Sequence, residues 1–403
     1  MEIENIPEDN RVTRDMEGID SKQGEFVDIP FIDLTRQYSK YRYEIKMAID
    51  RVLTSGIYAS GAEAEGFESE FAEYYGIANC ISVSSGMQAL EISLAALGIQ
   101  SGDDVVTVAN AGMHSTAAIL GIGAIPQFAE IDAHTLTMSP EGLVNAITPK
   151  TKAVIVTHLY GRVADIESIA AIADSHHLPL VEDCFQANGA RVNGQPVGTW
   201  GNVGCFCFAP AKNLGALGEA GAIITQDPMT AENARRIRQN GDNFSRDSHL
   251  AWSKSRFMDE IQAAILRVKL PLLEEWNLSR RMIAQTYAIC FDDLAADLKC
   301  PNQVNGSVFQ HYVIRIEHRD LLQKSLLHKG IGSAVHYPAA DYVYTPRGQR
   351  EKQHEALPET DKACAEVLSL PCYPELNPWE IERICGSVKQ SLAEIDRAAD
   401  LIS

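Results

Sequence analysis

The sequence has no apolar run long enough to cross a bilayer. Its first 26 residues, MEIENIPEDNRVTRDMEGIDSKQGEF, are acidic and polar and lack the apolar centre of a signal peptide. Internal repeats and low-complexity segments are also absent. We therefore expect a cytoplasmic protein without a membrane partner, in which residues 1–29 form a flexible acidic extension.

Positive charge is scarce in the chain. The 35 Lys and Arg residues are outnumbered by 54 Asp and Glu residues, which gives a formal net charge of −19 and a pI near 5.0. Such a surface argues against binding to nucleic acid or to an anionic membrane. A small anionic ligand stays open, because a binding site needs only a local positive potential.

The nine cysteines are scattered and form no CxxC pair, so neither a metal site nor a disulfide framework is indicated. Reduced thiols in a cytoplasmic protein are the simplest interpretation. Cys205 and Cys207 lie two residues apart in a strand-like run. Their side chains therefore point to the same face of the strand, where we expect them to pack as small apolar groups.

The 403 residues are 45% hydrophobic and 22% charged, which is sufficient for a large core. Short runs rich in Val and Ile predict strands at residues 80–85, 104–110, 125–132, 152–158, 178–184, 204–209 and 221–226. Segments with helical periodicity separate most of them, for example 86–99 and 165–177. This alternation predicts an α/β fold with a large, mostly parallel sheet covered by helices on both faces.

A long helical stretch at residues 258–294 follows this region. Strands are then predicted at 311–317 and 333–338, and helices at 319–330 and 378–395. We interpret the chain as a large domain of residues 30–275 that carries the site and a smaller α+β domain of residues 276–403.

Ligands of open parallel sheets bind at the carboxyl ends of the strands, and three segments of interest lie there. The first is SVSSGMQAL, in which a strand runs through Gly86 directly into a helix. Glycine allows backbone N–H groups to approach a ligand, and a helix N-terminus favours an anion such as phosphate. An ordinary strand-to-helix turn explains this segment equally well.

The second segment, LVEDCFQANGA, places Glu182 and Asp183 at a strand end, with Gln186 shortly after. A carboxylate there can pair with a protonated ring nitrogen, or it can simply be solvated. In the third segment, Lys212 follows a strand and precedes Gly215, Gly218 and Gly221. A partly desolvated amine has a lowered pKa and can form a Schiff base, although any single lysine is more often on the surface.

The three segments are more specific together than each is alone. A phosphate cradle, a carboxylate for a pyridinium nitrogen and a Schiff-base lysine are the parts that a site for pyridoxal 5′-phosphate (PLP) requires. Their order along the chain is that of the fold-type I aminotransferases.

The chain resembles the DegT/DnrJ/EryC1/StrS family of sugar aminotransferases from about Pro30 to its C-terminus. The stretches that carry this resemblance are PFIDLTRQY, SGMQALEISLAALGI, GDDVVTV, TKAVIVTHLYGRVADIESI, LVEDCFQANGA, FAPAKNLGALGEAGAIIT, MDEIQAAILRVKLPLLEEWN, RDLLQKSLLHKGI, HYP and EVLSLPCYPEL. The segment KNLGALG is the most specific of them.

The resemblance implies a role for each matching residue. Lys212 would carry PLP, Asp183 would pair with its ring nitrogen, and Gln186 would lie near its phenolic oxygen. The backbone N–H groups of Gly86 and Met87 would bind its phosphate.

Four positions depart from the family pattern. Met87 stands in place of a threonine and Cys207 in place of a serine, so two hydroxyl contacts to the phosphate are lost. Met113, with His114 beside it, stands where an aromatic residue usually covers the ring. An asparagine that reaches the partner subunit's phosphate is replaced by Ser255, or by Lys254 if one residue is inserted.

The resemblance further implies a homodimer with shared active sites that transfers an amino group from glutamate to a nucleotide-linked keto-deoxysugar. A PLP-dependent sugar dehydratase of the same family is an alternative, but its members have histidine in place of Lys212. A protein that keeps the fold for sensing or assembly is a second alternative, which the altered phosphate contacts favour.

Overall fold

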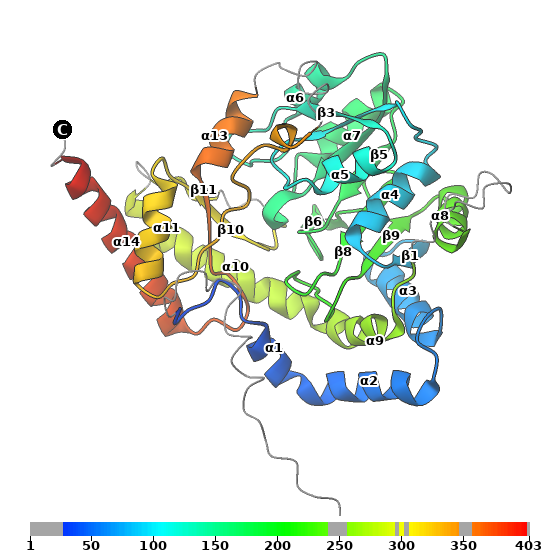
Figure 1. Ribbon diagram of the computed structural model, residues 1–403, viewed down its shortest axis with the longest axis horizontal. Coiled ribbons are helices and arrows are strands. Elements are labelled where there is room, and N and C mark those ends of the chain that lie inside the picture. Colours follow the sequence, from blue (N-terminus) through cyan, green and yellow to red (C-terminus); the bar gives the residue numbers. More distant parts are fainter. Residues whose placement is uncertain (1–26, 241–255, 295–297, 302–305, 346–356, 401–403) are drawn as a thin grey trace, which may run out of the picture.

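The computed structural model of the protein describes residues 27–240, 256–294, 298–301, 306–345 and 357–400. Its centre is a seven-stranded sheet in the order β1-β9-β8-β5-β4-β2-β3 (Figure 1). The strands are β1 (Asn79–Val83), β2 (Asp104–Val108), β3 (Ile125–Ala129), β4 (Thr151–Thr157), β5 (Leu180–Asp183), β8 (Val203–Cys207) and β9 (Gly221–Thr225). Only β9 runs antiparallel to its neighbours in this sheet. The seven predicted strands and the mostly parallel sheet are confirmed.

Helices cover both faces of the sheet, as the alternating pattern predicts. One face packs against α4 (Gly86–Ala96), α5 (His114–Gly121) and α8 (Pro228–Asn240). The opposite face packs against α3 (Ala62–Tyr75), α6 (Pro140–Ala146), α7 (Ile166–Ser175) and α9 (Glu260–Lys269). In the part of the chain that the structure describes, no helix combines the length and hydropathy needed to cross a membrane.

The strand period places successive residues of β8 on opposite faces. Cys205 and Cys207 belong to the core on the α4 side, whereas Phe206 belongs to the core on the α3 side. The prediction that the two cysteines share one face is therefore confirmed. All nine cysteines are free thiols in this structure.

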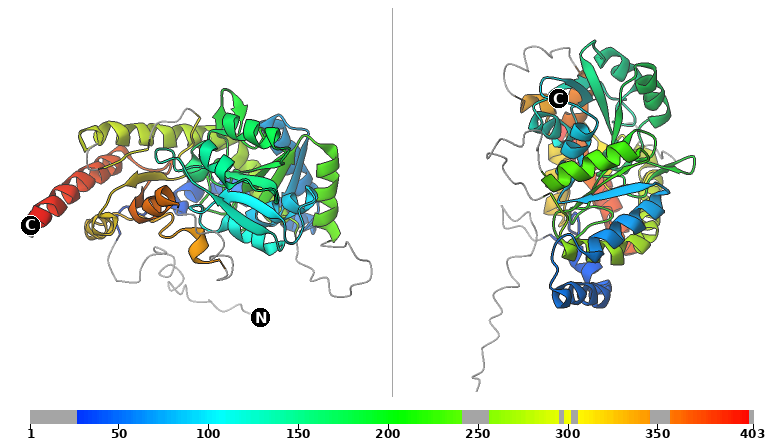
Figure 2. Two further views of the ribbon diagram at one scale, coloured as in Figure 1. Left: turned by 90° about the horizontal axis from the view of Figure 1, so that it is seen from above. Right: turned by 90° about the vertical axis from the view of Figure 1, so that its right-hand side faces the viewer.

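A second hydrophobic core surrounds the antiparallel pair β10 (Tyr312–Arg315) and β11 (Val367–Leu370). Helices α11 (Arg319–His328) and α14 (Pro378–Asp400) pack there, and α10 (Leu273–Cys290) extends into it from the large sheet (Figure 2). Ile29, which lies inside the predicted extension, is fully buried in this core. The division into domains at residue 275 stays a prediction.

The strand predicted at residues 333–338 is wrong. Only Ala334 pairs with β11, through two backbone hydrogen bonds to Ser369. The chain then turns away toward the large sheet at His336, Tyr337 and Pro338, and a proline offers no N–H to a ladder. The second strand is instead β11, which the sequence analysis missed.

The remaining elements are short or lie at the periphery. They are α1 (Leu34–Lys40), α2 (Arg42–Ser55), α13 (Pro358–Glu366), the hairpin β6 (Arg191–Val192) and β7 (Gln195–Pro196), and the 3₁₀ turns Leu159–Gly161, Leu270–Leu272, Asp292–Leu294 and Asp341–Val343.

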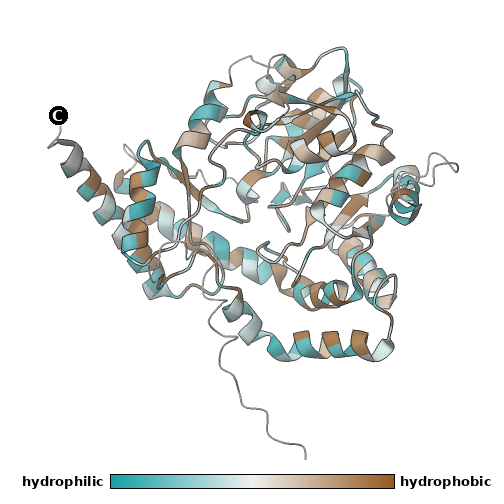
Figure 3. Ribbon diagram, in the orientation of Figure 1, coloured by the Kyte–Doolittle hydropathy of each residue, from teal (hydrophilic) through white to brown (hydrophobic). Residues whose placement is uncertain are grey.

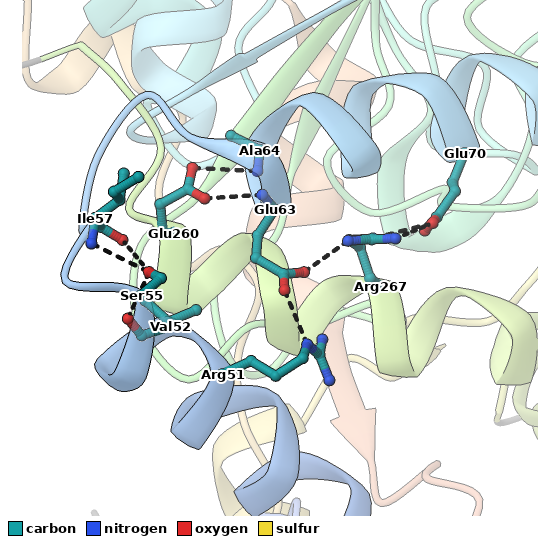
Figure 4. A network of polar contacts seen from close by, with 9 residues as sticks. All are labelled: Arg51, Val52, Ser55, Ile57, Glu63, Ala64, Glu70, Glu260 and Arg267. Carbon is teal, nitrogen blue, oxygen red and sulfur yellow. Dashed lines mark hydrogen bonds and ion pairs between the residues drawn. The ribbon is translucent and has the colours of Figure 1, made fainter.

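Helix α3 is capped by a residue that is distant in sequence (Figure 4). Its N-cap, Gly61, has no side chain to accept a hydrogen bond, and the buried carboxylate of Glu260 on α9 does so instead. Glu260 accepts from the backbone N–H groups of Gly61, Glu63 and Ala64 at 2.8 to 3.2 Å. These bonds fix α3 on α9, the helix that also contacts the Lys212 loop.

Replacing this carboxylate tests its contribution to stability. We expect Glu260→Ala to lower the free energy of unfolding by about 2 kcal/mol or more, because it leaves buried N–H groups without an acceptor. Chemical denaturation measures the change, with the exposed acid Glu65 of the same helix as a control through Glu65→Ala. Equal losses in the two variants would contradict the account.

Candidate active site

The junction of β1 and α4 forms a cradle of backbone N–H groups. Ser85 is the N-cap of α4, and its hydroxyl accepts from the N–H of Gln88 at 3.2 Å. The N–H groups of Gly86 and Met87 belong to the first helical turn, where the helix supplies no acceptor. They lie at the positive end of the helix dipole, which suits a phosphate group.

Glycine is required at position 86 by close packing. A Cβ there would lie 2.6 Å from Cβ of Cys207 and 2.8 Å from Cζ of Phe185. A Cβ on Gly221 would likewise lie 2.4 Å from the carbonyl oxygen of Ser85. The glycines at positions 86 and 221 therefore allow the ends of β5 and β8 and the start of β9 to pack directly against the start of α4.

Asp183 ends β5 and is nearly fully buried, on the same sheet face as Cys205 and Cys207. Its carboxylate accepts hydrogen bonds from Ser115 Oγ at 3.0 Å and Thr157 Oγ1 at 3.3 Å. It also accepts from the backbone N–H of Phe185 at 3.1 Å. These donors hold the carboxylate in one orientation.

Its neighbour Glu182 has a different role. Glu182 is fully buried on the other face of the sheet and accepts from the backbone N–H groups of Gly198, Trp200 and Gly201, each at 2.7 Å. It also contacts His158 Nε2 at 3.1 Å. Glu182 therefore holds the loop at residues 198–201. Of the two carboxylates, Asp183 is the one on the face that carries the candidate site.

Gln186 bridges two segments of the site. Its amide oxygen accepts from the backbone N–H of Tyr160 at 2.6 Å, and its amide nitrogen donates to the hydroxyl of Tyr337 at 3.1 Å. The ring of Tyr337 packs on Gly112, where a Cβ would lie 2.4 Å from Cζ of the ring. The HYP motif thus brings an aromatic ring to the site.

Met113 ends the turn that leads from β2 into α5, and His114 is the first residue of that helix. Met113 is the N-cap of α5, has φ 69°, and donates its backbone N–H to Asp341. The ring of His114 lies edge-on to Phe185 at 5.8 Å between centroids, and its centroid is 6.3 Å from that of Tyr337. The aromatic ring that this turn places among the site residues is therefore that of His114.

The Lys212 loop is held rigidly from several sides. The backbone N–H of Asn213 donates to the side-chain oxygen of Gln310, and its side-chain amide nitrogen donates to Asn277 and to the carbonyl oxygen of Val308. A Cβ on Gly215 would lie 2.3 Å from the carbonyl oxygen of Pro210. Glycine is therefore required for the loop to fold back beside Lys212.

A pair of imidazole rings lies near Lys212. His311 and His336 stack at 4.1 Å between centroids, and His336 Nδ1 is 2.9 Å from Ser369 Oγ. Burial and the nearby charge of Lys212 lower the pKa of His336 to about 4, and burial with the neighbouring His336 holds the pKa of His311 well below its usual value. Both rings are therefore neutral at pH 7.

Most of the predicted site residues converge at the carboxyl ends of the strands. Cys207 contacts Gly86, and burial raises the pKa of its thiol while the charge of Lys212 opposes this shift. Ser255 and Lys254 lie outside the described residues. The sequence analysis missed the contributions of Ser115, Thr157, His311, His336, Tyr337 and Asp341. Of these only His336 and Tyr337, in the HYP motif, carried a sequence signal.

The profile of the DegT/DnrJ/EryC1/StrS aminotransferase family matches residues 40–389. The chain belongs to this family. It is 39% identical over 364 residues to the erythromycin biosynthesis sensory transduction protein EryC1 of Saccharopolyspora erythraea, which covers 90% of this chain and 99% of the relative. It is 36% identical over 379 residues to the dTDP-3-amino-3,4,6-trideoxy-alpha-D-glucose transaminase of Streptomyces venezuelae, covering 94% and 100%.

A solved relative has the same architecture. The crystal structure of S. venezuelae DesV in complex with a ketimine intermediate superposes with a TM-score of 0.83 at 36% identity, covering 91% of this chain and 98% of DesV. The predictions of a fold-type I architecture, of membership in the DegT/DnrJ/EryC1/StrS family and of an aminotransferase are confirmed.

The sequence predicts that Met87 and Cys207 replace two hydroxyl groups that contact the phosphate, and substitution can put these hydroxyls back. We expect the double variant Met87→Thr with Cys207→Ser to bind PLP more tightly, because hydrogen bonds to a charged group are worth roughly 1.5–3 kcal/mol each, or about tenfold or more in affinity. Titration of the cofactor-free protein with PLP measures the change. An unchanged dissociation constant, together with no effect of Lys254→Ala, would show that these residues do not contact the phosphate.

The neutral imidazole of His336 makes stability depend on pH. Its folded pKa is lowered, so between about pH 6.5 and pH 4 the unfolded chain binds a proton that the folded chain does not. The contribution of neutral His336 to the free energy of unfolding is complete above about pH 6.5 and is lost as the pH falls toward 4. In His336→Gln, this loss should disappear from denaturation curves recorded between pH 7 and pH 5. His176→Gln, at an exposed histidine, is the control; identical pH slopes in all three proteins would refute the assignment.

Proposed function

We propose that the protein is a PLP-dependent aminotransferase that moves an amino group from glutamate to a nucleotide-linked keto-deoxysugar. The observation that carries the proposal is the convergence of the α4 cradle, buried Asp183 and the Lys212 loop at one edge of the sheet. The printed activity of the S. venezuelae relative, a dTDP-aminosugar transaminase, supports the substrate class.

The residues present fit PLP. Lys212 would hold the cofactor covalently, and the N–H groups of Gly86 and Met87 would bind its phosphate. Asp183, fixed by its hydroxyl donors, would pair with the protonated ring nitrogen. Gln186 lies on the same loop as Asp183 and would face the phenolic oxygen. The ring of His114, rather than the side chain of Met113, would cover the cofactor ring.

The chain's own groups then divide the work of amino transfer. When bound, PLP withdraws electrons and stabilises the negative charge that forms when the donor's Cα loses its proton. The amine of Lys212 would act as the base that takes the proton from the donor's Cα and as the acid that returns it. Asp183 would keep the ring nitrogen protonated, and the neutral His311–His336 pair adds no positive charge beside the amine.

Two alternatives remain to be separated by experiment. The dehydratase alternative is disfavoured because Lys212 is present. The EryC1 relative carries a sensory transduction name, and this favours a non-catalytic role as the second candidate.

Lys212→Ala decides between catalysis and a non-catalytic role. We expect the variant to lose both the visible absorbance of lysine-bound PLP and all amino transfer, with an unchanged thermal midpoint of the cofactor-free protein. Lys150→Ala, at an exposed lysine, is the matched control. Amino transfer that survives in the Lys212 variant would refute the role of Lys212, and wild-type protein that binds PLP without responding to glutamate would favour sensing.

An exposed apolar patch supports the homodimer. The outer side of α2 and the residues that follow it expose Tyr43, Met47, Leu53, Ile57 and Tyr58, each by 46% or more. The helix lies at the edge of the molecule and carries hydrophobic residues along its length (Figure 3). Its inner side packs on α9, which binds the Lys212 loop through Gln262 and Leu217. We propose that a second copy covers this apolar patch and completes the site.

Charge in the patch should separate the subunits. We expect Met47→Glu with Leu53→Glu to shift the protein from dimer to monomer in sedimentation experiments and to abolish amino transfer. Met229→Glu, at an exposed methionine on α8, should change neither property. A fully active monomer would rule out a shared site.

A further inference from the structure

Helix α5 has no cap of its own. Its N-cap residue Met113 is in the left-handed region with φ 69° and makes no side-chain cap. Gly112 before it also has a positive φ, of 72°. A left-handed non-glycine residue is strained and persists only where surrounding contacts hold it.

Asp341 supplies these contacts from a segment more than two hundred residues away. Its Oδ1 accepts from the backbone N–H of Met113 at 2.9 Å, and its Oδ2 accepts from Thr116 Oγ1 at 2.6 Å. Its own N–H donates to the carbonyl oxygen of Ala109 at 2.6 Å. The turn between β2 and α5 is therefore held at both ends.

Asp341 is 1% exposed, and no cation among the described residues forms an ion pair with its carboxylate. Burial raises its pKa to about 6, against the hydrogen bonds from Thr116 and Met113. Placing an acid in such a position is unfavourable for stability, and groups of this kind concentrate at functional sites.

The carboxylate of Asp341 holds Met113 and Thr116, and the two residues between them, His114 and Ser115, face the site. Ser115 donates to Asp183 at 3.0 Å, and the ring of His114 packs against Phe185. Tyr337, four residues before Asp341, packs on Gly112 and accepts from Gln186. The segment of residues 337–341 thus contacts both the turn before α5 and the loop that follows β5.

We propose that Asp341 is a positioning residue: it holds the strained turn at Gly112 and Met113 so that Ser115 orients Asp183 and His114 lies at the cofactor face. The effect on cofactor chemistry rests on the proposed function. The effect on the turn itself does not, so the two can be tested separately.

Hydrogen exchange of the cofactor-free protein tests the structural part. Asp341→Ala should raise exchange in the peptide that covers residues 110–121, and Asp341→Asn, which can still accept from Met113, should restore part of the protection. Glu130 is the matched control, because it caps α13 from a distance by accepting from Glu359 and Thr360. Glu130→Ala should raise exchange in α13 and near Ile131, whose N–H also donates to Glu130, but not at residues 110–121. Unchanged exchange at residues 110–121 in Asp341→Ala overturns the proposal, whatever the protein's activity.

A double-mutant cycle tests the link to Asp183. Asp341→Ala should lower the rate of the glutamate half-reaction more than tenfold at saturating glutamate, which corresponds to about 1.4 kcal/mol. In the Asp183→Asn background the same substitution should have little further effect, because both act through one carboxylate. If the double variant loses rate by the product of the two single fold-losses, the two residues act independently. That result would overturn the positioning role of Asp341. Thr116→Val provides a milder variant with a smaller loss in the same direction if Asp341→Ala fails to fold.

Discussion

Two neighbouring carboxylates at the end of β5 lie on opposite faces of the sheet, and the site depends on this alternation. Because strand residues alternate, Glu182 faces the loop at residues 198–201 while Asp183 faces α4 and α5. A shift of register by one residue would exchange these roles and would place a loop-closing carboxylate in the site. The parallel neighbours β4 and β8 fix the register through pairs on both sides of β5.

Around this strand end, carboxylates hold the surrounding helices from a distance. Glu260 caps α3, Asp341 caps α5, and Glu130 caps α13. In each case the acceptor comes from a segment distant in sequence, so capping also fixes tertiary packing. The helices α3 and α5 pack on opposite faces of the sheet that carries the site, and α5 carries Ser115, which donates to Asp183.

Much of the fold could be predicted from the sequence. The seven strands of the large sheet carry short apolar runs rich in Val and Ile, as expected of a sheet covered on both faces, and Lys212 and Gly86 lie in motifs with a physical reason for their glycines. The strand at 333–338 was wrong because its alternating residues serve ring stacking and the turn at Tyr337 instead of a ladder. Asp341 carried no signal, since nothing local shows that an acid will cap a helix far away in sequence. The positions of Ser255 and Lys254 stay outside the described residues.

We propose that Asp183 serves the cofactor while Glu182 serves the fold, so that catalysis and folding make different demands on adjacent residues. The most direct test compares Asp183→Asn with Glu182→Gln in the PLP-loaded protein, with the rate of the glutamate half-reaction and the free energy of unfolding as readouts. Asp183→Asn should keep its stability and its PLP but slow the half-reaction by at least about tenfold. Glu182→Gln should lose stability by about 1–3 kcal/mol while the folded fraction reacts at the normal rate. The reverse assignment of losses would contradict the account.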